Sequence, residues 1–261
     1  MGKIFRNLDL KARHLEVLKI SVSFIVLFLL YHSAEYMLLF NNNIAGFFGF
    51  QFLFFITAWF FGNWNMNNGL TFWGLSFSKL KLKHFMIGIF LGLLLYAIPY
   101  LISLSIRVEF ITNIPDWKDI LKLSLPFAFG VMFSSFSEDV LTRATVFNLF
   151  NNKIKVIWIV LISSLVYLLN HIYRLNESFD TLSYIFFLGV LLIIPLILTK
   201  NLWITGFMHW SGNVFFYVTH NVIQTESATH FLTPNRIFLI WILILIPILY
   251  YLGSKYKEKL I

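Results

Sequence analysis

The chain has 261 residues, of which 59% are hydrophobic and 12% charged, and its formal net charge is +8. A soluble domain carries about 25% charged residues, so this composition excludes a water-soluble globule and indicates an integral membrane protein. No cysteine is present, which excludes disulfides, thiolate metal sites and cysteine nucleophiles. The positive charge does not require a nucleic-acid partner, because lysine and arginine accumulate in the cytoplasmic loops of membrane proteins.

Apolar runs recur along the whole chain, separated by short polar connections. A helix needs about 20 apolar residues to cross a hydrocarbon layer of about 30 Å. We find no internal repeat, so we expect one all-α membrane domain over 1–261, a helix bundle with a basic N-terminal segment at 1–17. The runs predict about eight transmembrane helices, at 18–40, 44–62, 84–106, 121–142, 154–173, 181–199, 202–220 and 235–253.

The basic residues are distributed unevenly between the two sets of connections. If the N-terminus is cytoplasmic, fourteen Lys and Arg residues fall on the cytoplasmic side and five on the other, with Arg143 inside a span. The positive-inside rule favours this orientation. We therefore predict a multi-pass protein of the cell membrane with both termini in the cytoplasm.

Ionisable side chains within the spans are the most informative residues. Each costs about 2.5–3.5 kcal/mol at the centre of a membrane helix, so it tends to face the protein interior and to serve a function. His32 and Glu35 lie three residues apart on the first span and predict a packing or cavity-lining pair. His220 is expected at the membrane surface. The remaining candidates form three groups, with Asn170 as a further polar residue beside the second.

The first group is Ser137-Glu138-Asp139-Val-Leu-Thr-Arg143. Asp139 and Arg143 are four residues apart, so they share a helical face and are expected to pair. Glu138 points about 100° away around the helix, which leaves its carboxylate available for chemistry. A buried ion network that only fixes helix packing is an equally good interpretation of this group alone.

The second and third groups place histidines on two later spans. Tyr167 and His171 share one face, as do His209 and Asn213. Alone, the histidine of the second group is more typical of packing, and the third group is typical of interhelical hydrogen bonding. Together, a carboxylate, an imidazole and two hydrogen-bond donors indicate a site that activates water and stabilises an oxyanion.

With all three groups in order, the chain resembles the CPBP family of CAAX proteases and bacteriocin-processing enzymes, also called the abortive-infection family. That family's pattern is Glu-Glu-x-x-x-Arg, then Phe-x-x-x-His, then His-x-x-x-Asn or Asp. The matching segments here begin at Glu138, Tyr167 and His209, within a motif core at about 121–220. The type II CAAX prenyl endopeptidase is the member that the chain resembles.

The resemblance implies a catalytic role for four residues of this chain. Glu138 and His171 would activate the attacking water. His209 and Asn213 would form the oxyanion hole. The site would lie in a water-filled cavity, which opens to the cytosol in the family's CAAX enzyme.

The resemblance also implies supporting residues, and two of them depart from the family pattern. Asp139 and Arg143 would hold the first motif in place, although Asp139 stands where the family has glutamate. Tyr167 stands where the family has phenylalanine, which adds a hydroxyl that needs a partner. The first departure bears on activity more than on fold.

The expected partners are a peptide or membrane-anchored protein substrate and the lipid bilayer, with no nucleic acid. No cofactor is expected, because the resemblance favours a glutamate-type protease and the soluble zinc signature His-Glu-x-x-His is absent. A catalytic zinc held by Glu138, His171 and His209 stays open as an alternative.

Two other functions compete with intramembrane proteolysis. A non-proteolytic membrane factor of the same fold, for bacteriocin immunity or signalling, is suggested by Asp139 and by such roles in the family. A transporter is suggested only by the intramembrane charges, and the absence of an internal repeat argues against it.

Overall fold

The computed structural model describes residues 2–228, 231–256 and 258, and most of them are helical. Helices α4 and α5 form one continuous rod through a π-helical turn at Val140–Ala144, so the nine α-helices make eight rods. The α-helices are α1 (Gly2–Leu39), α2 (Ile44–Met66), α3 (Leu82–Ser105), α4 (Trp117–Asp139), α5 (Thr145–Phe150), α6 (Val156–Asn170), α7 (Phe179–Thr199), α8 (Leu202–Tyr217) and α9 (Pro234–Lys255).

The expected all-α helix bundle is confirmed, but the spans differ in length from the prediction. In the part of the chain that the structure describes, six helical rods are long and apolar enough to cross a membrane: α1 from Leu15, α2, α3, α4–α5, α7 and α9. Helix α6 has only 15 residues and ends at Asn170, earlier than the apolar run at 154–173 suggests. Helix α8 has 16 residues and continues through a π-helical turn at Val218–Val222, so its rod covers the expected span at 202–220. The count of eight spans is therefore approximate.

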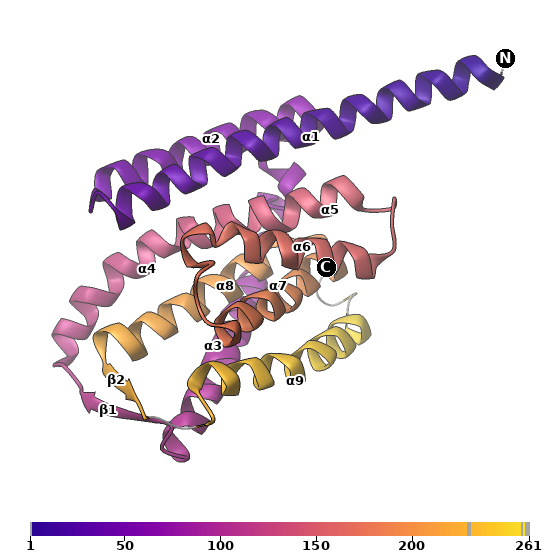
Figure 1. Ribbon diagram of the computed structural model, residues 1–261. Helices are drawn as coiled ribbons and strands as arrows, with labels where there is room; N and C mark the ends of the chain where they lie inside the picture. Colours follow the sequence, from indigo (N-terminus) through magenta and orange to yellow (C-terminus); the bar gives the residue numbers. More distant parts are fainter. Residues whose placement is uncertain (1, 229–230, 257, 259–261) are drawn as a thin grey trace.

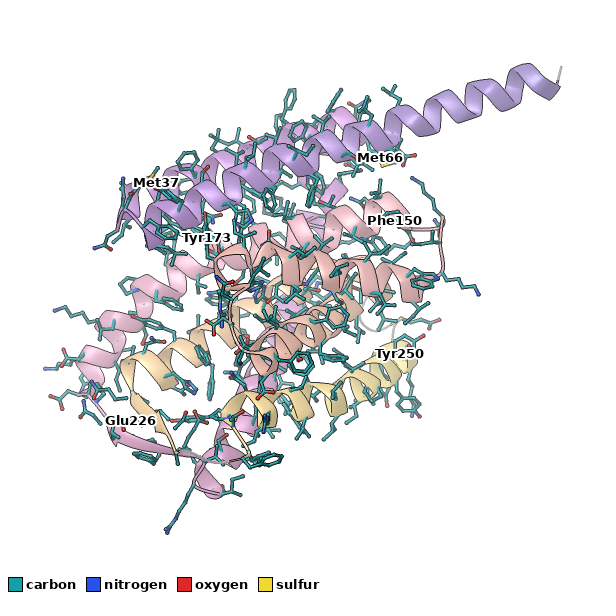
Figure 2. All side chains as sticks on the ribbon, in the orientation of Figure 1. Met37, Met66, Phe150, Tyr173, Glu226 and Tyr250 are labelled. Atoms are coloured by element: carbon teal, nitrogen blue, oxygen red, sulfur yellow. The ribbon has the colours of Figure 1, made fainter. Side chains whose placement is uncertain are left out.

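The helices run alternately up and down, so the chain connections gather at two ends of the bundle. Figure 2 shows Met66, Phe150 and Tyr250 at one end and Met37 and Glu226 at the other. Helices α1 and α2 lie side by side along one flank, as Figure 1 shows. The basic N-terminal segment continues α1 as one helix. Many large apolar side chains point outward, as expected for helices that face lipid.

A short two-stranded sheet was not anticipated in this bundle. Strand β1 (Glu109–Asn113) pairs antiparallel with β2 (Gln224–Ser227), and Phe110 lies opposite Glu226. Both strands lie in segments that the sequence predicts only as polar connections between spans. Their pairing satisfies backbone groups at the end of the bundle away from the N-terminus.

Close helix contacts explain two small residues in the motif region. Helix α8 packs against α3 and α4, and Gly206 of α8 meets the ring of Phe136. A Cβ atom there would lie 2.0 Å from that ring. On α3, a Cβ at Gly92 would lie 2.3 Å from the carbonyl oxygen of Met208. These glycines let α8 approach both neighbours closely, which sets the position of His209.

Candidate active site

The rod formed by α4 and α5 carries the two adjacent carboxylates. Residues 140–144 form a π-helical turn directly after Asp139, and such turns are frequent at functional sites. The whole turn is buried, with exposed fractions of 0–1%. The rod therefore presents Glu138 and Asp139 deep inside the bundle.

Asp139 and Arg143 form the ion pair that their spacing predicts. Asp139 Oδ1 accepts a hydrogen bond from Arg143 Nη1, and both side chains are completely buried. The guanidinium carbon lies 4.3 Å from the centre of the Tyr167 ring, a distance at which a cation is attracted to an aromatic face. We call Asp139, Arg143 and the Tyr167 ring the Asp139 cluster.

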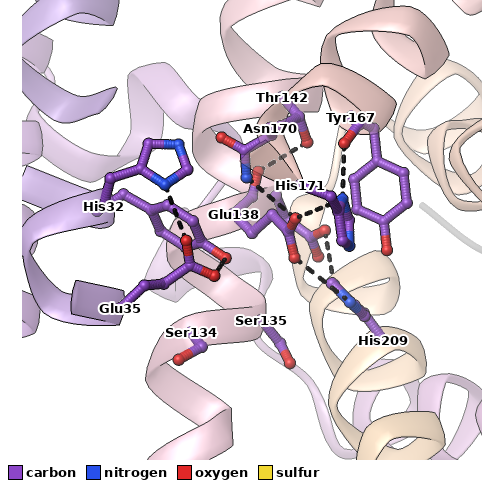
Figure 3. Close-up of polar contacts among 12 residues, drawn as sticks. His32, Glu35, Ser134, Ser135, Glu138, Thr142, Tyr167, Asn170, His171 and His209 are labelled. Carbon is purple, nitrogen blue, oxygen red and sulfur yellow. Dashed lines mark hydrogen bonds and ion pairs between the residues drawn. The ribbon is translucent and has the colours of Figure 1, made fainter. Parts of the chain in front are cut away.

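Glu138 points away from this pair and towards residues of α6 and α8 (Figure 3). Its Oε1 accepts a hydrogen bond of 3.1 Å from Asn170 Nδ2. The same oxygen lies 3.8 Å from His171 Nδ1, and Oε2 lies 3.7 Å from His209 Nε2. Both histidine separations exceed hydrogen-bond length, and a gap of this size can be bridged by water. We call Glu138, Asn170, His171 and His209 the Glu138 cluster.

His171 caps the C-terminal end of α6. Its Nδ1 lies 2.8 Å from the carbonyl oxygen of Tyr167. A carbonyl oxygen can only accept, so Nδ1 carries the proton in this contact. In the neutral ring, Nε2 then keeps its lone pair, as a general base requires.

His209 connects the two clusters. Its Nδ1 lies 3.1 Å from Asp139 Oδ1, so Nδ1 donates to the carboxylate and Nε2 faces Glu138. Asn213, one turn along α8, donates from Nδ2 to Ser135 Oγ at 3.2 Å. The expected common face of His209 and Asn213 thus points towards α4, where both side chains are held by polar partners.

The short length of α6 explains how His171 and His209 can meet, although they occupy different positions along the predicted spans at 154–173 and 202–220. His171 follows the last residue of α6, whereas His209 is the eighth residue of α8. At 1.5 Å per residue, α6 is only about 22 Å long, less than the hydrocarbon thickness of about 30 Å. Its end can therefore lie inside the bundle, at the level of Glu138.

A cavity of about 210 Å³ contains this site. Four sequence-predicted residues line it: Glu138, His171, His209 and Asn213. Tyr167 lines it as well, whereas Asp139 and Arg143 lie behind the wall. The cavity separates the predicted site residues into those that a bound molecule can touch and those that it cannot.

Several polar residues of the site were not assigned a role from the sequence. Asn170 was noted only as a polar neighbour of His171, and Ser135 was not singled out. Arg174 lines the outer cavity, as does the pair of His220 and Glu109, which lie 3.0 Å apart. The sequence does signal Asn170, because it is an amide within an apolar helix, but it cannot reveal a contact across 32 residues.

The predicted pair of His32 and Glu35 is present on α1. His32 Nδ1 lies 2.8 Å from Glu35 Oε2, and the Tyr31 hydroxyl donates to Glu35 Oε1 at 3.3 Å. Figure 3 shows the pair beside the Glu138 cluster. Both hydrogen bonds lie within α1, which fits a packing role.

The donor atoms of the site bear on whether it could hold a metal ion. Within the described part of the chain, no group of three or more His, Asp or Glu side chains is arranged to hold a metal ion. His171 and His209 each use Nδ1 in a hydrogen bond, and His209 Nε2 lies 3.7 Å from Glu138 Oε2. A chelator experiment therefore tests whether any activity of the chain depends on zinc.

A comparison with known protein families identifies the region of the chain that carries the three motifs. Residues 120–215 match the family model of type II CAAX prenyl endopeptidase Rce1-like proteins. The matched stretch runs from α4 into α8 and contains all three motifs, which confirms the resemblance seen in the sequence. Neither a curated protein nor a solved structure matches the chain. The family match and the six apolar rods together indicate a multi-pass membrane protein.

Proposed function

Because residues 120–215 are similar to the type II CAAX prenyl endopeptidase Rce1-like family, we propose that the chain is an intramembrane endopeptidase that uses Glu138 as its central carboxylate. Its substrates are peptides or membrane-anchored proteins whose scissile bond reaches the cavity. The observation that carries this proposal is the convergence of His171 and His209, from two separate helices, on the one carboxylate of Glu138.

Water would be activated between Glu138 and His171. A water molecule beside Glu138 gives a proton to its carboxylate and the hydroxide attacks the peptide carbonyl, while His171, with Nδ1 3.8 Å from Oε1, helps to orient that water. Asn170 holds Oε1 from the other side, which orients the carboxylate. When the carbon–nitrogen bond breaks, the proton held by the base passes to the leaving amine.

The oxyanion would be stabilised by donors from α8. Asn213 Nδ2 is a donor that already faces α4. His209 donates its Nδ1 proton to Asp139, so its Nε2 can donate to an oxyanion only when both ring nitrogens carry protons. One such donor typically contributes about 10²–10³ in rate.

The test is proteolysis by the purified protein in liposomes on a mixed peptide library. Glu138→Gln removes the base but keeps an amide oxygen that Asn170 can bind, so cleavage should fall by about 10²–10⁴-fold with little loss of stability. Glu35→Gln is the matched control, because it neutralises another intramembrane carboxylate outside the cavity. A parallel assay with chelator separates the glutamate mechanism from the zinc alternative.

The results discriminate between the candidate functions. Wild-type cleavage that is lost in Glu138→Gln, retained in Glu35→Gln and unaffected by chelator supports the proposal. Full cleavage by Glu138→Gln contradicts it, and sensitivity to chelator moves the same residues to a metal mechanism. If a cellular function of the chain survives Glu138→Gln, the non-proteolytic immunity or scaffold function becomes the better interpretation.

A further inference from the structure

The cavity extends from Glu138 towards one end of the bundle. We use "β end" for the end that carries β1 and β2, and "basic end" for the other. Besides the site residues, the cavity is lined by the last turns of α3, by β1, and by the start of α9. These residues include Tyr100, Ser103, Glu109, Pro234 and Asn235, and all of them lie at the β end.

Two polar lining residues beyond the Glu138 cluster are more exposed than Glu138, whereas Ser103 and Glu109 at the same end are buried. The side chain of Glu138 is 8% exposed, that of His171 17%, that of His220 23% and that of Arg174 45%. Each of these residues lines the cavity. The cavity therefore joins Glu138 to the more exposed residues His220 and Arg174 at the β end.

The opposite direction is closed by packed side chains. Val140, Leu141 and Arg143 follow Glu138 towards the basic end, and each has an exposed fraction of 0%. Leu191 and Leu192 of α7 are likewise fully buried. A second cavity, at the basic end, is lined by residues such as Asn148, Lys153 and Lys200 and shares no lining residue with the first.

The two ends differ in their basic residues. Among the described residues, the start of α1, the end of α9 and the connections at 67–83, 151–155 and 200–201 belong to the basic end, and they hold twelve Lys and Arg residues. The β end holds five, namely Arg107, Lys118, Lys122, Arg174 and Arg236. A bias of this size places the basic end in the cytoplasm.

These observations combine into one proposal, which rests on the proposed function. We propose that the active-site cavity opens to the extracytoplasmic side, so that the substrate is an exported peptide or the outer segment of a membrane-anchored protein. A prenylated C-terminus presented from the cytosol would face the closed, basic end. The proposal thus differs from the cytosolic opening that the family resemblance alone implies.

The first experiment determines the orientation without depending on activity. The chain has no cysteine, so single-cysteine variants can be labelled cleanly with a membrane-impermeant maleimide on intact cells. Lys118→Cys at the β end and Lys155→Cys at the basic end are matched, since both lysines are exposed. We expect strong labelling of Lys118→Cys and labelling of Lys155→Cys only after the cells are permeabilised. The reverse pattern would overturn the proposal.

A third variant reports on the cavity itself. Asn235 lines the cavity at the start of α9 and is half-buried. We expect Asn235→Cys to be labelled from outside intact cells, as Lys118→Cys is. Protection of Asn235→Cys in intact cells, with labelling from the cytoplasmic face of inverted vesicles, would contradict an outward opening.

The second experiment measures from which side cleavage occurs. Membrane-impermeant quenched peptides from the mixed library are added to right-side-out and inverted vesicles that contain equal amounts of the protein. We expect at least about tenfold faster cleavage by the right-side-out vesicles, and faster cleavage by inverted vesicles would overturn the proposal. Protein solubilised in detergent reports activity regardless of orientation. Absence of cleavage there contradicts the proposed function, while the labelling pattern still decides the face.

Discussion

Glu138 and Asp139 are consecutive residues of α4, yet their carboxylates lie in two different regions of the molecule. Glu138 lines a cavity and faces two histidines across gaps of 3.7–3.8 Å. Asp139 is fully buried against Arg143 and His209. The difference shows how a helix separates two identical functional groups: about 100° of rotation gives one carboxylate access to water and the other none.

The largest effect is expected when the Asp139 cluster loses Arg143. Arg143→Met removes the partner of a buried carboxylate, and an uncompensated buried charge typically costs about 3–5 kcal/mol. We expect this loss in the free energy of unfolding, measured by denaturation of the purified protein in mixed micelles. The double variant Arg143→Met with Asp139→Asn removes the orphaned charge and should recover part of the stability. Equal stability of Arg143→Met and wild type would mean that the pair does not support the fold.

Substitutions in the Glu138 cluster should lower the rate of cleavage rather than the stability of the fold. Asn170→Ala removes the hydrogen bond to Glu138 Oε1, and hydrogen bonds to charged groups are worth about 1.5–3 kcal/mol. We expect kcat to fall by about ten- to hundredfold while the substrate KM stays near that of wild type. Asn65→Ala is the control, because Asn65 bonds only to α1 and α2 groups. A loss confined to KM would argue against a role in orienting Glu138.

Restoring the family's second glutamate tests how tightly the Asp139 cluster is packed. Asp139→Glu adds a methylene to a site with no exposed surface, and overpacking typically costs about 1–3 kcal/mol. We expect a lower free energy of unfolding and a shift of His209, which is seen as reduced kcat in the peptide assay. A variant that is more stable and more active than wild type would show that the shorter acid is a functional compromise.

The smallest effect is expected on α1. Glu35→Gln keeps an oxygen that can accept from His32 and Tyr31, so the free energy of unfolding should change by no more than about 0.5–1.5 kcal/mol. Cleavage should stay within about twofold of wild type, because a change outside the cavity leaves ΔG‡ nearly unchanged. A large loss of cleavage at unchanged stability would show that His32 and Glu35 belong to the site. The distinction between α1 and the motif helices would then no longer hold.

Local patterns in the sequence were sufficient for the helices and for the pairs within one helix. Asp139 with Arg143 and His32 with Glu35 follow from residues three or four apart, since the helix repeat brings them together in any fold. Apolar composition likewise determines that these helices belong in a membrane. The three spaced motifs identified the family region, which the family match confirms.

Other features were decided only by the tertiary structure. The end of α6, the pairing of β1 with β2 and the hydrogen bond from Asn170 to Glu138 depend on contacts between distant segments. The direction in which the cavity opens is of the same kind, because it depends on which helix ends leave space and which are packed. The helical period of the sequence determines which side chains lie on each face of a helix. Only the packing of the helices against one another determines which residues those side chains contact.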